Sequence, residues 1–323
     1  TIALDTLSMA EPMRFQRILA SVCKGFEDHQ LSALPLSIFD FEREYGQALQ
    51  YLRHGKNIGK VVLKIDNVQS IMRSPDVLRE STGAYVITGG LGGLGLVTAK
   101  VLARAGAKHI VLVSRSGRVA YEGQGLEDDL AWLQSSASGA VVETVCCDVS
   151  DESAVEAMLG EVRIRAGRIE GVIHSAGVIR DGLIRGGAAG KGASDVWHSK
   201  ASSAWWLHKH TAEDDLGVFF VYSSITAALG NVGQSVYGAA NRFLDGLMSM
   251  RRSRGMCGLS IQWPAISGVG MAAADPSLAL SGYSIGPEEV SQVLEDSLSS
   301  LRGRGGSNGL STILAVPRNI RDM

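Results

Sequence analysis

The sequence has no excess of charge of either sign, since 31 lysines and arginines face 33 aspartates and glutamates and the formal net charge is −2. A chain with this balance has no broad electric field to gather nucleic acid or an anionic membrane. It also has neither an apolar run near the roughly 18 residues of a membrane-spanning helix nor a signal-peptide pattern at its start. We therefore expect a soluble, cytoplasmic protein without nucleic-acid or membrane partners.

Cysteine is scarce as well. The four cysteines lack the spacing of a disulfide framework or a C-x-x-C pair, and they are Cys23, Cys146, Cys147 and Cys257. His208 and His210 stand together without a nearby acidic third ligand. We expect reduced cysteines in the core and no metal site.

Glycine, by contrast, is abundant, at 39 of 323 residues against an average of about 7%. The glycines cluster, and the densest cluster is GGLGGLG at residues 89–95. It follows a β-branched run at 85–88 and precedes an apolar helical pattern at 94–105, which is the strand–turn–helix setting of a dinucleotide fingerprint.

A polar, turn-rich stretch at 66–83 separates two patterned regions. We expect an N-terminal segment, 1–80, and a catalytic domain, 81–323. The pattern of the first segment predicts helices at 13–26 and 41–53, a turn at 33–35 and a strand at 60–65.

From residue 84 onward, short apolar runs alternate with amphipathic stretches, which predicts an α/β fold with a doubly wound parallel sheet of the Rossmann type. Seven strands are expected, at 84–88, 109–113, 141–146, 171–174, 218–222, 259–262 and 312–315. The helices expected between and after them are 94–105, 128–135, 151–165, 195–211, 235–254 and one beginning at 287.

The strand ends of this fold predict a cofactor site. At the end of the second strand, where an NAD site would carry an acid, the chain has Ser114 and Arg115, which favours the 2′-phosphate of NADPH. Asp148 could accept from the adenine amino group, and small residues at 175–177 leave room for the nicotinamide ribose. The expected cofactor-binding residues are Thr88, Gly89, Gly90, Gly92, Gly93, Leu94, Gly95, Ser114, Arg115, Asp148, Val149, Ser175, Ala176 and Gly177.

A set of polar residues further along suggests the chemistry. Ser224 ends a strand, Tyr237 begins the next helix, and Asn241 lies four residues later on the same face. Lys200 lies on the preceding helix. Their order after a dinucleotide fingerprint makes them the candidate catalytic residues.

These motifs resemble the ketoreductase domain of polyketide and animal-type fatty acid synthases, a branch of the short-chain dehydrogenase/reductase family. The resemblance covers about 82–301 and rests on TGGLGGLG, LVSRSG, CDVSD, HSAGV, the Lys200 segment and YSSITAALGNVGQSVYGAANRFLD. Ordinary short-chain dehydrogenases carry lysine at the position where this chain has Asn241. Here the lysine comes earlier in the chain, at Lys200, and this exchange of positions is typical of synthase ketoreductases.

The resemblance implies NADPH-dependent reduction of a β-ketoacyl thioester, delivered by an acyl carrier protein, to the β-hydroxyacyl thioester. Tyr237 would donate the proton and Ser224 would bind the carbonyl. Lys200 would lower the pKa of the tyrosine and contact the ribose, while Asn241 would hold Lys200 or a water relay.

The family also suggests where the substrate lies. The glycine- and alanine-rich segment 264–286 corresponds to the substrate lid, for which we expect a mobile loop and a short helix. Asp181, Leu229 and Met271 are the expected substrate contacts. Asp181 keeps the last acid of the type B motif, and Leu229 replaces the tryptophan that marks type A, which together favour a type B product.

Residues 34–63 resemble, more loosely, the end of an enoyl reductase domain, either as a boundary remnant or as a structural subdomain. Neighbouring synthase domains are therefore expected partners. Two alternatives stay open: a reductively silent structural or epimerising ketoreductase fold, and a free-standing short-chain dehydrogenase.

Overall fold

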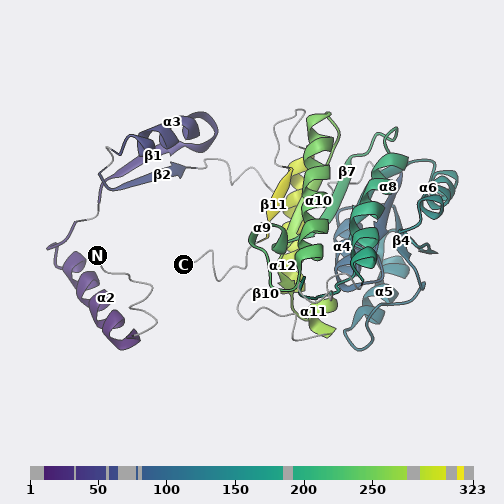
Figure 1. The fold of residues 1–323 in the computed structure, drawn as a ribbon, viewed down its shortest axis with the longest axis horizontal. Helices are drawn as coiled ribbons and strands as arrows, with labels where there is room; N and C mark the ends of the chain where they lie inside the picture. The colour runs from purple at the N-terminus through teal and green to yellow at the C-terminus, as the bar shows by residue number, and fades with distance from the viewer. Residues whose placement is uncertain are drawn as a thin grey trace. The chain divides into compact units, whose positions relative to one another are not determined.

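A computed structural model of the protein describes residues 11–32, 34–55, 58–64, 78, 82–184, 192–274, 284–302 and 311–315 (Figure 1). It divides into two compact units, 1–72 and 73–323, and each is described by itself.

The first unit contains the helix α2 (Pro12–Glu27) and a small βαβ element. The strands β1 (Leu36–Asp40) and β2 (Lys60–Lys64) pair in parallel, and the helix α3 (Phe41–Arg53) connects them. The expected helices and the strand of this unit are present, except that Ile65 lies outside the described residues. The strand β1 is missing from the sequence-based expectation, because five residues next to a proline carry too little alternation to predict a strand.

The second unit is built on one parallel sheet of seven strands, in the order β11-β8-β7-β6-β3-β4-β5. All seven expected strands are present in it, with small shifts at their ends. Their bounds are β3 (Ala84–Thr88), β4 (His109–Ser114), β5 (Val141–Cys146), β6 (Ile169–His174), β7 (Val218–Ser224), β8 (Leu259–Trp263) and β11 (Thr312–Leu314).

Helices cover both faces of this sheet, and alternate residues of each strand belong to two separate cores. Ile87 and Leu112 pack under α4 (Gly93–Arg104), α5 (Leu126–Gln134) and α12 (Pro287–Arg302). Val86 and Val111 pack under α6 (Glu152–Ala166), α8 (Ser203–His210) and α10 (Ser235–Ser253). Burial on both faces explains the nearly continuous apolar runs of the strands.

The largest departure from expectation is the segment 195–211, which is not one regular helix. It consists of α7 (Ala193–Trp197), a π-helical turn η3 (His198–Ser202) and α8. A π turn contains one residue more than an α turn, a local event that hydrophobic periodicity does not reveal.

The expected lid segment is described only in part. It contains the short paired strands β9 (Ala265–Ile266) and β10 (Ser284–Ile285) and a four-residue helix, α11 (Met271–Ala274). The expected mobile loop falls largely on 275–283, which lie outside the described residues.

Two further results concern the cysteines and the helices. All four cysteines are free, but Cys23 and Cys146 are exposed and only Cys147 is buried, so the expectation of four core cysteines was wrong. Cys146 ends an outer strand of the sheet, whose side chains are less covered. None of the helices in the described ranges is both long and apolar enough to span a bilayer.

The order of the strands in the sheet reverses at β3 and β6. The chain runs outward from β3 through β4 to β5 and then returns to the other side of β3 at β6. In an open parallel sheet, ligands bind outside the carboxyl ends of the strands where the order reverses. The candidate residues follow these strand ends.

Candidate active site

The glycine-rich turn joins β3 to α4 by close backbone packing. Gly89 has φ +66°, and a Cβ there would lie 2.8 Å from the backbone nitrogen of Ala176. A Cβ on Gly95 would lie 2.3 Å from the carbonyl oxygen of Gly89. The helix α4 begins after Gly92 without a side-chain cap, so its first amide groups are left for an anion. These features fit a dinucleotide pyrophosphate.

The ends of the neighbouring strands carry the residues expected to recognise the adenosine half. Ser114 ends β4, and its hydroxyl accepts from the Gly117 amide at 2.9 Å. Arg115 and Asp148 are both exposed. Hydrogen bonds from Ser150, together with the charge of Arg115, lower the pKa of Asp148. An exposed cation and an ionised acceptor at adjacent strand ends fit an adenosine with a phosphate on its ribose.

The loop after β6 contacts the end of β3. The Ser175 hydroxyl donates to the Thr88 carbonyl at 2.8 Å, which ties this loop to the end of β3. A Cβ on Gly177 would lie 2.8 Å from the Cε of Lys200. The absence of a side chain at Gly177 therefore makes room for the lysine.

Lys200 is buried within the π turn η3. Its Nζ donates to the carbonyl of Tyr222 at 2.8 Å and lies 5.3 Å from the centre of the Tyr237 ring. Burial lowers the pKa of Lys200 to about 7, and the carboxylate of Asp245 opposes that shift. The ammonium therefore titrates near neutral pH, beside a phenol.

Tyr237 lies in the first turn of α10, facing Ser224 at the end of β7. Burial raises the pKa of Tyr237, with a smaller contribution from the charge of Asp181, and it outweighs the nearby polar side chains of Asn241 and Ser224, which act to lower that pKa. This balance differs from the expected lowering by Lys200, because desolvation of a phenolate is the larger effect.

Asn241 was expected to hold either Lys200 or a water relay, and the hydrogen bond that the described residues show is to neither. Its Nδ2 donates to the carbonyl of Tyr237 at 2.8 Å, one turn earlier in α10. Its buried Oδ1 has no hydrogen-bond partner among the described residues. A buried acceptor without a partner carries a cost, so this oxygen is available to a ligand or a water in the site.

Asp245 is a buried acid beside the site that the sequence analysis did not identify, and its charge raises the pKa of Lys200. It is buried, and it accepts from the Ser260 hydroxyl at 2.6 Å and from the Gln262 amide at 2.8 Å. Its spacing offered a signal, because Tyr237, Asn241 and Asp245 lie at i, i+4 and i+8 on one helix face.

The expected substrate contacts lie on three separate segments. The Asp181 carboxylate accepts from the Gln234 side chain at 3.0 Å, which ties the loop after β6 to the start of α10. Leu229 ends the short helix α9 (Thr226–Leu229) and is 76% exposed. Met271 begins α11, and beside it the Gln124 side chain accepts from the Gly270 amide at 2.7 Å.

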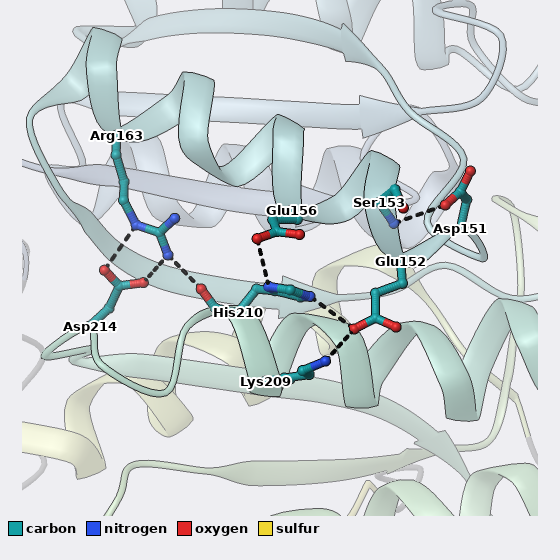
Figure 2. A network of polar contacts seen from close by, with 8 residues as sticks. All are labelled: Asp151, Glu152, Ser153, Glu156, Arg163, Lys209, His210 and Asp214. Carbon is teal, nitrogen blue, oxygen red and sulfur yellow. Dashed lines mark hydrogen bonds and ion pairs between the residues drawn. The ribbon is translucent and has the colours of Figure 1, made fainter.

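The helix that carries Lys200 is anchored at its other end by a polar network (Figure 2). Glu152 of α6 accepts from Lys209 at 2.6 Å and contacts His210 at 3.2 Å. Arg163 donates to the His210 carbonyl and to Asp214, both at 2.6 Å. These contacts fix α8 against α6. The neighbouring His208 does not join the network, since its Nδ1 accepts from Arg251 at 2.8 Å.

Comparisons with known proteins find relatives of this chain among polyketide synthases. A family model described as "KR domain" matches residues 83–268. The chain is 38% identical over 258 residues to the phenolphthiocerol synthesis polyketide synthase type I Pks15/1 of Mycobacterium marinum, covering 80% of this chain and 12% of that protein. It is equally identical to a Mycobacterium tuberculosis protein named "Putative inactive phenolphthiocerol synthesis polyketide synthase type I Pks1", covering 80% and 15%. The chain thus spans a small fraction of these relatives.

A solved structure described as "A-type Ketoreductases from Modular Polyketide Synthase" shares 32% identity. It aligns with a TM-score of 0.63 over 76% of this chain and 48% of that chain.

Proposed function

Because this chain belongs to the KR-domain family of polyketide synthases, a branch of the short-chain dehydrogenase/reductase oxidoreductases, we propose that it reduces a β-ketoacyl thioester with NADPH. The product is the β-hydroxyacyl thioester. The observation that carries the proposal is the meeting of Lys200, Ser224 and Tyr237 beside the strand ends where the sheet order reverses.

The family and the fold bind a nicotinamide cofactor, and the residues of this chain favour NADPH. The uncapped start of α4 and the close-packed glycine turn suit the pyrophosphate. Arg115 is suited to pair with the 2′-phosphate, with the Ser114 hydroxyl as a second donor. Bound NADPH would supply the hydride that reaches the keto carbon.

The protein supplies the proton and stabilises the developing charge. The hydroxyls of Tyr237 and Ser224 both donate to the keto oxygen, and Tyr237 transfers its proton as that oxygen becomes an alkoxide. A buried phenol with a raised pKa keeps its proton at neutral pH, so Tyr237 is in the correct state to act as the acid.

Lys200 makes this transfer possible. Its ammonium, near the Tyr237 ring, stabilises the phenolate left after the proton has moved. The Oδ1 of Asn241, which has no partner among the described residues, can accept from a water that returns the proton.

The proposal also includes the stereochemistry of the product. Asp181 is held by Gln234 close enough to influence the pKa of Tyr237, and the exposed Leu229 stands where type A members carry tryptophan. We infer a type B product on these two residues. The A-type description belongs to the neighbouring solved structure.

The place of the chain in a larger assembly is also inferred. The relatives are polyketide synthases far longer than this chain, which implies neighbouring synthase domains. We propose that an acyl carrier protein delivers the substrate. We also propose that residues 1–80, with their β1–α3–β2 element, are an enoyl-reductase tail or a structural subdomain, and that the catalytic domain is 81–323.

The test uses the purified chain with a simple β-ketoacyl thioester, following NADPH oxidation by absorbance with NADH in parallel. We expect NADPH to be used well ahead of NADH and chiral chromatography to give the 3R-hydroxy product. The matched variant Tyr237→Phe should bind NADPH normally and lose at least about a hundredfold in kcat.

Two other results of this test would contradict parts of the proposal. NADPH binding without turnover, on a free or a carrier-bound thioester, would favour the silent fold, a state that the name of one relative also carries. Near-normal turnover by Tyr237→Phe would refute the tyrosine as proton donor.

A further inference from the structure

Lys200 owes its position to an irregular turn. The Ser203 amide bonds to the His198 carbonyl five residues earlier, which is the hydrogen bond of a π turn. One added residue rotates the positions that follow by about 100° around the helix axis. Lys200 lies within this turn, so its place depends on the turn, and something must stabilise the turn, since a π turn is less favourable than a regular helix.

The group that meets this turn is the buried imidazole of His174, the last residue of β6. Its Nε2 lies 3.1 Å from the Lys200 carbonyl oxygen and 3.1 Å from the Ser203 hydroxyl. Its Nδ1 lies 2.7 Å from the Thr88 hydroxyl, at the end of β3. One ring therefore connects the strand that leads into the glycine-rich turn with the turn that carries Lys200.

The bond to the Lys200 carbonyl requires one tautomer of His174. Burial and the charge of Lys200 lower the pKa of His174 to about 3, so the ring is neutral and has one N–H. The Lys200 carbonyl can only accept, so its bond to the ring requires the proton on Nε2, and Nδ1 then accepts from the Thr88 hydroxyl. In this tautomer both ring nitrogens have a partner, and the Lys200 carbonyl has a donor.

We infer that His174 is a positioning residue: held by Thr88, it bonds to the Lys200 carbonyl, stabilises the π turn and so places the lysine ammonium against Tyr237. The effect of His174 on catalysis depends on the proposed reductase function. The contact between His174 and the π turn does not depend on it, because that contact is present without substrate.

Two conservative substitutions separate the two ends of the ring. The amide of asparagine has the reach of Nδ1, so His174→Asn keeps a partner for Thr88 and loses the bond to Lys200. The amide of glutamine has the reach of Nε2, so His174→Gln keeps the bond to the Lys200 carbonyl. The matched control is His208→Asn, because His208 is also buried but bonds to Arg251.

The first readout needs no turnover. Amide hydrogen exchange of the peptide containing 198–203 should quicken about tenfold or more in His174→Asn, and change less than threefold in His174→Gln and in His208→Asn. The second readout is kinetic. His174→Asn should lose about ten- to a hundredfold in kcat with the NADPH Kd within about threefold of the wild type, and His174→Gln should recover most of that loss.

Three outcomes would overturn the inference: unchanged exchange and kcat in His174→Asn, equal losses in the Asn and Gln variants, or the same effects from His208→Asn. Should His174→Asn not fold, Thr88→Val removes the hydroxyl that orients the ring at nearly constant volume. It should quicken exchange at 198–203, and no change would equally overturn the inference. An inactive wild type would refute the reductase proposal and leave the exchange comparison intact.

Discussion

Two helical glycines of the catalytic unit should respond in opposite directions to the same added methyl group. Gly95 lies in the first turn of α4, where a Cβ would lie 2.3 Å from the Gly89 carbonyl oxygen and 2.6 Å from the Gly90 Cα. Gly160 lies within α6, and no atom lies within 4 Å of the corresponding position. Both atoms that oppose the methyl at Gly95 belong to backbone, so the loop itself must move.

The magnitudes follow from packing and helix propensity. Overpacking of a close contact lowers the free energy of unfolding by about 1–3 kcal/mol. Alanine in place of a helical glycine raises it by up to about 1 kcal/mol. We therefore expect Gly160→Ala to stabilise by up to about 1 kcal/mol. Gly95→Ala should destabilise by about 1–2 kcal/mol, because the clash exceeds the gain.

Urea unfolding followed by tryptophan fluorescence measures both effects. The five tryptophans all lie within the second unit, so their fluorescence reports this unit, and they are Trp132, Trp197, Trp205, Trp206 and Trp263. The midpoints should move in opposite directions at constant m value. NADPH binding, measured by fluorescence, should weaken more than tenfold in Gly95→Ala and stay unchanged in Gly160→Ala.

A Gly95→Ala protein with wild-type stability and wild-type NADPH affinity would refute the reasoning. It would mean that the glycine-rich turn shifts freely by several tenths of an ångström. The close contact would then have no part in shaping a cofactor site.

Two further predictions concern charge and the lid segment. Asp245→Asn removes the carboxylate that opposes the lowered pKa of Lys200, so that pKa should fall below about 7 and the ammonium should be lost at lower pH. The alkaline limb of the kcat/KM profile should therefore move to lower pH, and a shift to higher pH would contradict the electrostatic assignment. Gln124→Ala removes a side-chain amide that accepts from the Gly270 amide and donates to its carbonyl, beside the start of α4. NADPH titration should show about five- to tenfold weaker binding with kcat nearly retained, whereas unchanged binding would exclude this contact as a support of the site.

Most of the fold could be predicted from local patterns of apolar and polar residues. The seven strands of the large sheet were all expected, because buried parallel strands form apolar runs that end at turns. The small strand β1 was not, since its five residues next to a proline carry too little alternation to predict a strand. The exposure of Cys23 and Cys146 was likewise not expected, because it depends on what covers each position.

The sequence by itself determined the Rossmann sheet, the glycine-rich turn and the order of Lys200, Ser224 and Tyr237 along the chain, because each is written in a local pattern or spacing. Only the tertiary structure decided how those groups act. The bond from His174 to the Lys200 carbonyl and the lysine pKa near 7 arise between segments far apart in sequence, and the π turn is a local irregularity that hydrophobic periodicity does not reveal. His174 meets Thr88 across 86 residues. Burial and hydrogen-bond geometry at such contacts depend on the packed interior, which no local pattern encodes.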